Sequence, residues 1–149
     1  MAMFTINDIL DYVPDIQTFG IAQFDEEITK SENDIFRLLR IRWWPTVQSK
    51  VYDLSVHRTS YQAEMDNNLL DTSQLKRAGV FHCLAYYILP KLSKFEVDGD
   101  RFKEMLDYYK ARFDEEFDLV TRELYYDWDS DSVFEDDERV HKERLRLIR

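Results

Sequence analysis

The chain has 149 residues, the size of one domain, and its 44% apolar and 15% aromatic content predicts a packed core despite 34% charged residues. With only three Gly and three Pro, the sequence offers little turn chemistry for a multistranded sheet, so we expect a mainly α fold. The net charge of −10 opposes tight binding to the outside of a nucleic acid, because such binding needs a basic footprint.

The cysteine count and the hydropathy of the sequence indicate the cellular compartment. Cys83 is the single cysteine, so no internal disulfide is expected and the chain is compatible with a reducing cytoplasm. The first residues show no basic region followed by an apolar run, and no stretch approaches the length of a membrane span. We therefore expect a soluble intracellular protein with no membrane partner.

Two helices are expected in the first third of the chain. Thr5-Ile-Asn-Asp8 resembles a capping box with Asp in place of Glu, and it begins a short helix that Pro14 ends. After a turn at Gly20, apolar residues recur at helical spacing and predict a helix from Phe24 to Trp43. Trp44 precedes a proline, which favours an extended backbone.

The middle of the chain shows a different pattern. Between Thr46 and Asn68, the apolar residues Tyr52, Leu54 and Val56 alternate with polar ones, which is typical of a short strand. We expect an extended or loop segment there.

Two further helices complete the expected bundle. Asp71-Thr-Ser-Gln74 resembles a second capping box, and it begins a helix that Pro90 kinks or stops. After a turn at Asp98-Gly99-Asp100, apolar residues from Phe102 to Leu124 lie along one face of a helix about 35 Å long. The expected fold is thus a small helical bundle with one long C-terminal helix, an extended central segment and a C-terminal tail.

An acidic segment follows this long helix. Residues 127–138 nearly reproduce the spacing of the twelve-residue EF-hand loop, and Ser132 replaces the Gly that normally supplies a positive φ at the sixth position. Two interpretations stay open: a calcium site, or an acidic turn that caps the helix. The ligands of a calcium site would be Asp127, Asp129, Asp131, the Val133 carbonyl and Glu138.

The charge changes sign at the end of the chain. From Glu123 to Glu138 there are eight acids and no Lys or Arg, whereas residues 139–149 hold five cations and one acid. The interleaved apolar residues favour a docking peptide for an acidic partner surface over a solvated terminus. The residues expected to bind this partner are Arg139, Lys142, Arg144, Leu145, Arg146, Leu147, Ile148 and Arg149.

Four stretches of the sequence together resemble the head-to-tail connector, or adaptor, proteins of tailed bacteriophages. These motifs are helix faces and turns rather than a catalytic signature, and the resemblance covers most of the chain from Thr5 onward. The stretches are Arg40-Ile-Arg-Trp-Trp-Pro45, Ser73-Gln-Leu-Lys-Arg-Ala78, Ala85-Tyr-Tyr-Ile-Leu-Pro-Lys-Leu92 and Arg112-Phe-Asp-Glu-Glu116.

The resemblance implies a structural virion protein of the neck, assembled in the host cytoplasm. Members of this family are small helical proteins that form a homo-oligomeric ring, commonly a dodecamer, under the portal vertex. The portal protein binds one side of the ring and head-closure or tail proteins bind the other, while DNA passes through the lumen without sequence-specific binding. The expected domains are a helical connector-like domain (1–126), the acidic EF-hand-like loop (127–138) and a basic docking tail (139–149) that reaches the portal.

A ring subunit needs apolar surface beyond its own core. Adjacent helical residues point in two directions, so one member of the pair Trp43-Trp44 can pack inward while the other faces a neighbouring subunit or loop. We therefore expect Trp43 and Trp44 at or near a subunit interface.

The sequence offers less support for two other classes of function. His82 and Cys83 are adjacent, but adjacent helical side chains point about 100° apart, so a buried structural thiol is favoured over a catalytic dyad. His57 and His141 have no second ligand at zinc spacing, and no Gly-rich phosphate loop is present. We expect no enzyme and no certain cofactor. The alternative is a single-EF-hand-like, calcium-responsive interaction protein.

Overall fold

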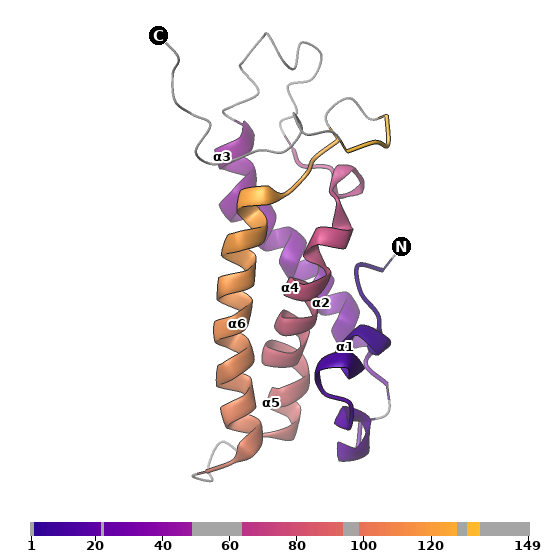
Figure 1. Cartoon of the computed structure of the whole chain (residues 1–149), viewed down its shortest axis with the longest axis vertical. Coiled ribbons are helices and arrows are strands. Elements are labelled where there is room, and N and C mark those ends of the chain that lie inside the picture. Colours follow the sequence, from indigo (N-terminus) through magenta and orange to yellow (C-terminus); the bar gives the residue numbers. More distant parts are fainter. Residues whose placement is uncertain (1, 22, 49–63, 94–98, 128–130, 135–149) are drawn as a thin grey trace.

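Three long helical segments form the computed structural model, and the second runs antiparallel to the first and the third, as Figure 1 shows. The structure describes residues 2–21, 23–48, 64–93, 99–127 and 131–134. The first segment comprises α2 (Asp25–Leu38), the π-helical η2 (Leu39–Trp43) and α3 (Trp44–Gln48); the second comprises α4 (Thr72–Cys83), the π-helical η4 (Leu84–Ile88) and α5 (Leu89–Leu92); the third is α6 (Arg101–Glu123).

Three short helices complete the described structure: α1 (Ile6–Tyr12) and the 3-10 turns η1 (Ile16–Phe19) and η3 (Asn67–Leu69). Within the described ranges, the extended pairing is limited to one antiparallel bridge between Leu70 and Tyr126. The predicted mainly α fold with one long C-terminal helix is confirmed. No helix in these ranges is both long enough and apolar enough to cross a lipid bilayer.

The second helical segment is the centre of the bundle. All eight residues from Ala78 to Ala85 are buried, because α2 and α6 both contact this segment and the N-terminal residues cover it as well. In Figure 1 it lies between α6 on one side and α1 on the other. We call residues 72–92 the central helix.

Side-chain caps begin the helices much as the sequence predicts. The Thr5 N–H donates to Asp8 Oδ2 (2.7 Å), Asp71 Oδ1 accepts from the Ser73 N–H (3.1 Å), and Asp100 Oδ1 accepts from the Phe102 N–H (2.9 Å). The capping box expected at Asp71-Gln74 forms only its Asp71 half, because Gln74 is engaged elsewhere.

The amide of Gln74 instead closes the C-terminal end of α6. Its Nε2 donates to the Glu123 carbonyl (3.1 Å) and its Oε1 accepts from the Tyr125 N–H (2.9 Å). The last carbonyl groups of a helix have no partner inside the helix, so Gln74 satisfies one of them from the neighbouring helix. This pair of bonds joins the start of the central helix to the end of α6.

The prediction that the first helical segment ends before Pro45 is wrong. Trp44 is helical (φ −55°, ψ −44°), and the helix continues to Gln48, so the start of the expected loop at Thr46 is helical too. Of the two outcomes expected at Pro90, a kink or a stop, the stop does not occur at the proline itself, because the central helix continues to Leu92. The alternating residues Tyr52, Leu54 and Val56 lie outside the described residues.

The two prolines are accommodated in the same way. A five-residue π-helical segment ends two residues before Pro45 and again two residues before Pro90. In an α-helix the proline ring clashes with the carbonyl four residues earlier and leaves it without a donor. The wider π turn changes the position of that carbonyl, which lets the helix pass the proline.

Gly79 allows the N-terminal residues to reach the central helix. A Cβ built on Gly79 would lie 2.6 Å from Cδ1 and 2.7 Å from Cε1 of Phe4. Phe4 itself is 1% exposed, so its ring has little free space into which to move. The absence of a side chain at residue 79 is therefore required for this contact.

We expect Gly79→Ala to lower the free energy of unfolding by about 1–3 kcal/mol, the typical cost of overpacking a core. The better helix propensity of Ala offsets only part of this cost. Chemical denaturation measures the change, and Phe4→Leu in the Gly79→Ala background should recover part of the loss. A Gly79→Ala protein more stable than its parent would show that Phe4 is free to move.

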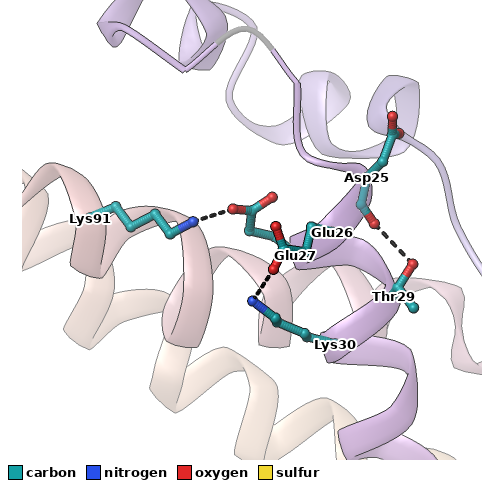
Figure 2. Close-up of polar contacts among 6 residues, drawn as sticks. All are labelled: Asp25, Glu26, Glu27, Thr29, Lys30 and Lys91. Atoms are coloured by element: carbon teal, nitrogen blue, oxygen red, sulfur yellow. Dashed lines mark hydrogen bonds and ion pairs between the residues drawn. The ribbon is translucent and has the colours of Figure 1, made fainter.

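Ion pairs tie the base of the bundle together. Figure 2 shows Lys91 of α5 reaching Glu27 of α2, while Lys30 contacts Glu26 one turn away (2.6 Å). Glu27 is buried, and its hydrogen bond from Lys91 holds the pKa of its carboxyl below the usual range. A buried carboxylate needs such a partner, so this pair fixes the spacing of α2 and the central helix.

Candidate functional site

An aromatic cluster lies where the first helical segment meets the residues after α6. The ring centroids of Trp43 and Trp44 are 6.3 and 5.2 Å from that of Tyr126, and 6.2 Å from each other. Trp43 and Trp44 are only 3% and 5% exposed. Both indoles therefore pack inside the chain against Tyr126, and neither offers surface to a neighbouring subunit in this structure.

Backbone hydrogen bonds hold Tyr126 in this cluster. The Asp127 N–H donates to the Leu69 carbonyl (2.9 Å), and the Asp71 N–H donates to the Tyr125 carbonyl (3.2 Å). The Tyr126 hydroxyl accepts from the Asp66 N–H (3.1 Å). The segment before the central helix and the segment after α6 thus close this end of the bundle together.

The acidic loop begins directly after this closure. Asp127 is 4% exposed, and its two carboxylate oxygens accept from the N–H groups of Asp131 (3.1 Å) and Ser132 (2.9 Å). Asp131 Oδ1 accepts from the Val133 N–H (2.8 Å). Ser132 has φ 68°, the left-handed conformation expected at the sixth position of an EF-hand loop.

The metal site predicted for this loop is only partly described. Of its expected ligands, Asp129 and Glu138 lie outside the described residues. Among the residues that are described, no three His, Cys, Asp or Glu side chains converge as metal ligands. Each oxygen of Asp127 keeps a second lone pair after accepting its backbone bond, so this carboxylate retains the capacity to bind a cation.

On the outer surface of the bundle, the most exposed of the large apolar side chains on helices belong to two helical segments. Ile41 on η2 is 61% exposed, and Tyr108 and Leu119 on α6 are 59% and 57% exposed. Tyr108 and Leu119 are eleven residues apart, about three helical turns, so they lie on one side of α6. The basic tail from Arg139 to Arg149 lies outside the described residues.

A polar groove separates α1 from the central helix and α6. Its volume is about 460 Å³, and ion pairs from Lys76 to Asp8 (3.1 Å) and from Arg77 to Glu116 (3.9 Å) cross it. Because these charges neutralise one another within the chain, the groove has no strong preference for a charged ligand.

A buried polar cluster joins α2 to the central helix. His82 Nδ1 and Ser31 Oγ are 2.9 Å apart, and Ser31 Oγ also donates to the Gly79 carbonyl (3.3 Å). The Tyr87 hydroxyl donates to Asp34. Burial lowers the pKa of His82 from its ordinary value of 6.5 to about 4, although the charge of Asp34 acts in the opposite direction.

Cys83 is fully buried beside this cluster, as the sequence predicts for a structural thiol. Burial is the main cause that raises its pKa to about 12, so the thiol is protonated at neutral pH. A thiolate, rather than a thiol, is the nucleophile in cysteine chemistry. The position of Cys83 therefore suits packing.

Comparison with known proteins gives no relative: no family model matches the chain, and no curated protein or solved structure is similar to it.

We expect the protein to lose stability as the pH falls from about 6.5 to about 4, because of His82. The unfolded chain binds a proton at its ordinary pKa, whereas the folded chain binds one only near pH 4, so the unfolded state is favoured in between. The slope should not exceed about 1.4 kcal/mol per pH unit for this one group. Urea denaturation at several pH values measures it.

His82→Gln is the matched control, because it keeps a polar side chain beside Ser31 and leaves His57 and His141 unchanged. The slope above pH 4.5 should disappear in this variant, while carboxylates such as Glu27 still titrate at lower pH. An equal slope in both proteins would assign the pH dependence to other groups.

Proposed function

We propose that the chain is a head-to-tail connector of a tailed bacteriophage, a subunit of a ring between the portal and the head-closure or tail proteins. The observation that carries the proposal is apolar surface on two different helical segments, at Ile41 on η2 and at Tyr108 and Leu119 on α6. Nine aromatic side chains lie in the described core and three more pack against it, whereas Ile41, Tyr108 and Leu119 are exposed and offer apolar surface to other chains.

Three features support this function. The sequence motifs that resemble the connector family lie on the helices of a mainly helical bundle. The net charge of −10 suits a conduit for DNA, because an acidic wall does not gain the counterion-release affinity of a basic one. A ring also needs two different contact surfaces on each subunit, and α2–η2 and α6 each contact the central helix and each expose apolar side chains.

Removing the basic tail should separate portal binding from folding. A chain truncated after Glu138 should keep its helical content and melting temperature, because the described core ends at Tyr126. The truncated chain should fail to cosediment with portal-bearing heads, whereas the full chain should cosediment with them. Less of the full chain should cosediment at high salt, since charges are screened over about 10 Å at 0.1 M ionic strength.

Circular dichroism and cosedimentation are measured on the same two preparations, with heads that lack the portal as the control. Electron microscopy of the bound complex should show a ring at the portal vertex. Equal cosedimentation of truncated and full chains would move the portal contact to the helical body. Absence of binding by the full chain, with the fold intact, would contradict the connector function.

A calcium-responsive interaction protein is the second candidate, favoured by the loop after α6. Ser132 has the positive φ that an EF-hand loop needs at its sixth position, and Asp127 accepts backbone bonds from the fifth and sixth residues of the loop. The proposed ligands are Asp127, Asp129, Asp131, the Val133 carbonyl and Glu138.

Calcium should bind weakly at this loop, because Ser132 is less favourable than Gly at positive φ and a single loop has no partner to stabilise it. Titration calorimetry at millimolar calcium measures the heat of binding. Asp129→Ala with Glu138→Ala should abolish the heat, while Asp114→Ala with Glu115→Ala on α6 serves as a control with the same change of charge. Absence of heat in the parent would leave the loop as an acidic turn.

A further inference from the structure

A basic patch occupies the C-terminal half of the first helical segment. Arg37, Arg40 and Arg42 surround Ile41, and all four side chains are exposed. No acidic residue occurs between Ile35 and Gln48. Ile41, at 61%, is the most exposed of the large apolar side chains in the described ranges. Arg37 lies on α2 and the other three lie on η2, which continues it. We call these four residues the α2 patch.

The charges of the α2 patch are not neutralised within the described part of the chain. None of its three arginines forms an ion pair with a described residue; Arg40 Nη2 donates to the amide oxygen of Asn67 (3.2 Å). By contrast, Arg112 and Arg122 on α6 each pair with an acid of their own helix. In a chain with net charge −10, the α2 patch is thus a local surface of opposite sign.

A surface of complementary character lies on α6. The exposed acids Asp107, Glu115 and Asp118 lie beside Tyr108 and Leu119, and Asp114 is exposed one side further round the helix. The exposed cations Lys103 and Lys110 lie one turn before Asp107 and Asp114. Glu115 and Asp118 pair with arginines on the same helix, whereas Asp107 and Asp114 form no ion pair with a described residue. We call Tyr108, Leu119 and these four acids the α6 flank.

The two surfaces belong to different sides of the subunit. The central helix contacts both α2 and α6, and each of these helices turns its buried side chains towards it. Their exposed side chains therefore face away from the central helix in different directions. A patch that fits a different patch on the next copy makes a heterologous contact, which generates a closed ring or an open filament.

We propose that the α2 patch of one copy binds the α6 flank of the next. Ile41 supplies an apolar anchor that meets the apolar surface of Tyr108 and Leu119, while the arginines face Asp107 and Asp114 at the rim. The occupant is a second copy of this chain, because both halves of a complementary pair are present on one subunit. The inference rests on the proposed ring assembly and names the surfaces that form it.

Charge reversal on the full chain tests this contact. Arg37→Glu with Arg40→Glu reverses the α2 patch, and Asp107→Lys with Asp114→Lys reverses the α6 flank. Each variant alone should stay monomeric in sedimentation velocity at about 0.1 M salt, where long-range repulsion is screened and the parent chain forms larger species. A mixture of the two should assemble again, because each surface then meets one of opposite charge. Asp11→Lys with Asp15→Lys, exposed residues of the N-terminal segment outside both surfaces, is the control with the same change of charge as the α6 variant and should behave like the parent.

Cysteine crosslinking gives an independent measure of which surfaces meet. Ile41→Cys is placed in one chain and Leu119→Cys in a second chain that carries a tag of different mass. The native Cys83 is buried, so the introduced cysteines are the reactive thiols. A short bismaleimide should produce the mixed 41–119 dimer in large excess over either homodimer. Predominant 41–41 or 119–119 dimers would show a symmetric contact and overturn the inference, as would a parent chain that stays monomeric and yields no crosslink.

Two outcomes separate this inference from the proposed function. If the parent chain binds portal-bearing heads but the reversed variants assemble as it does, the contact is wrong and the connector function stands. If charge reversal and mixing behave as expected but the chain does not bind heads, the contact stands and the connector function fails. If the parent chain binds duplex DNA, and reversal of the α2 patch abolishes this binding but leaves assembly unchanged, the α2 patch is a nucleic-acid-binding surface and the inference is overturned.

Discussion

The complete burial of the central helix between Ala78 and Ala85 constrains the rest of the structure. A helix covered on every side has no face that water can solvate, so each of its polar groups needs a partner inside the protein. His82 meets this need through Ser31 of α2, and Gly79 lets Phe4 approach the backbone. The positions of α2 and the N-terminal residues therefore follow from the surface of one helix, and α6 completes its cover with Tyr109, Phe113 and Phe117.

Local patterns were sufficient for the long helix and its caps. Phe102, Met105, Leu106, Tyr109, Phe113, Phe117 and Val120 recur at spacings of three and four residues, which a helix places on one face and a strand does not. The rule that a proline ends a helix assumes an α-helix, in which the carbonyl four residues before the proline is blocked. Nothing in residue spacing shows that a π turn will change the position of that carbonyl. The same geometry recurs before Pro45 and Pro90, so it is a consistent property of this chain.

Tertiary contacts account for what the sequence did not reveal about Trp43 and Trp44. Their adjacency suggested that one ring turns outward, yet both contact Tyr126, which lies more than 80 residues further along the chain. Gln74 differs from its predicted role for a similar reason, because the end of α6 offers it better partners than its own helix. By contrast, the positive φ of Ser132 agrees with the sixth position of an EF-hand loop, the position that the spacing of the acids gives this residue.

The distribution of charge, rather than its total, decides how copies of this chain can approach one another. Two copies of the chain, each with a net charge of −10, repel at long range, but this repulsion is screened beyond about 10 Å at 0.1 M salt. Attraction between an arginine and a carboxylate in contact acts within that distance and is weakened less. The proposed contact between the α2 patch and the α6 flank therefore requires moderate salt, which suppresses the repulsion between whole copies. It also requires close packing of Ile41, which keeps the opposite charges in contact. A narrow range of ionic strength that favours assembly is the physical consequence of an acidic body with one local basic surface.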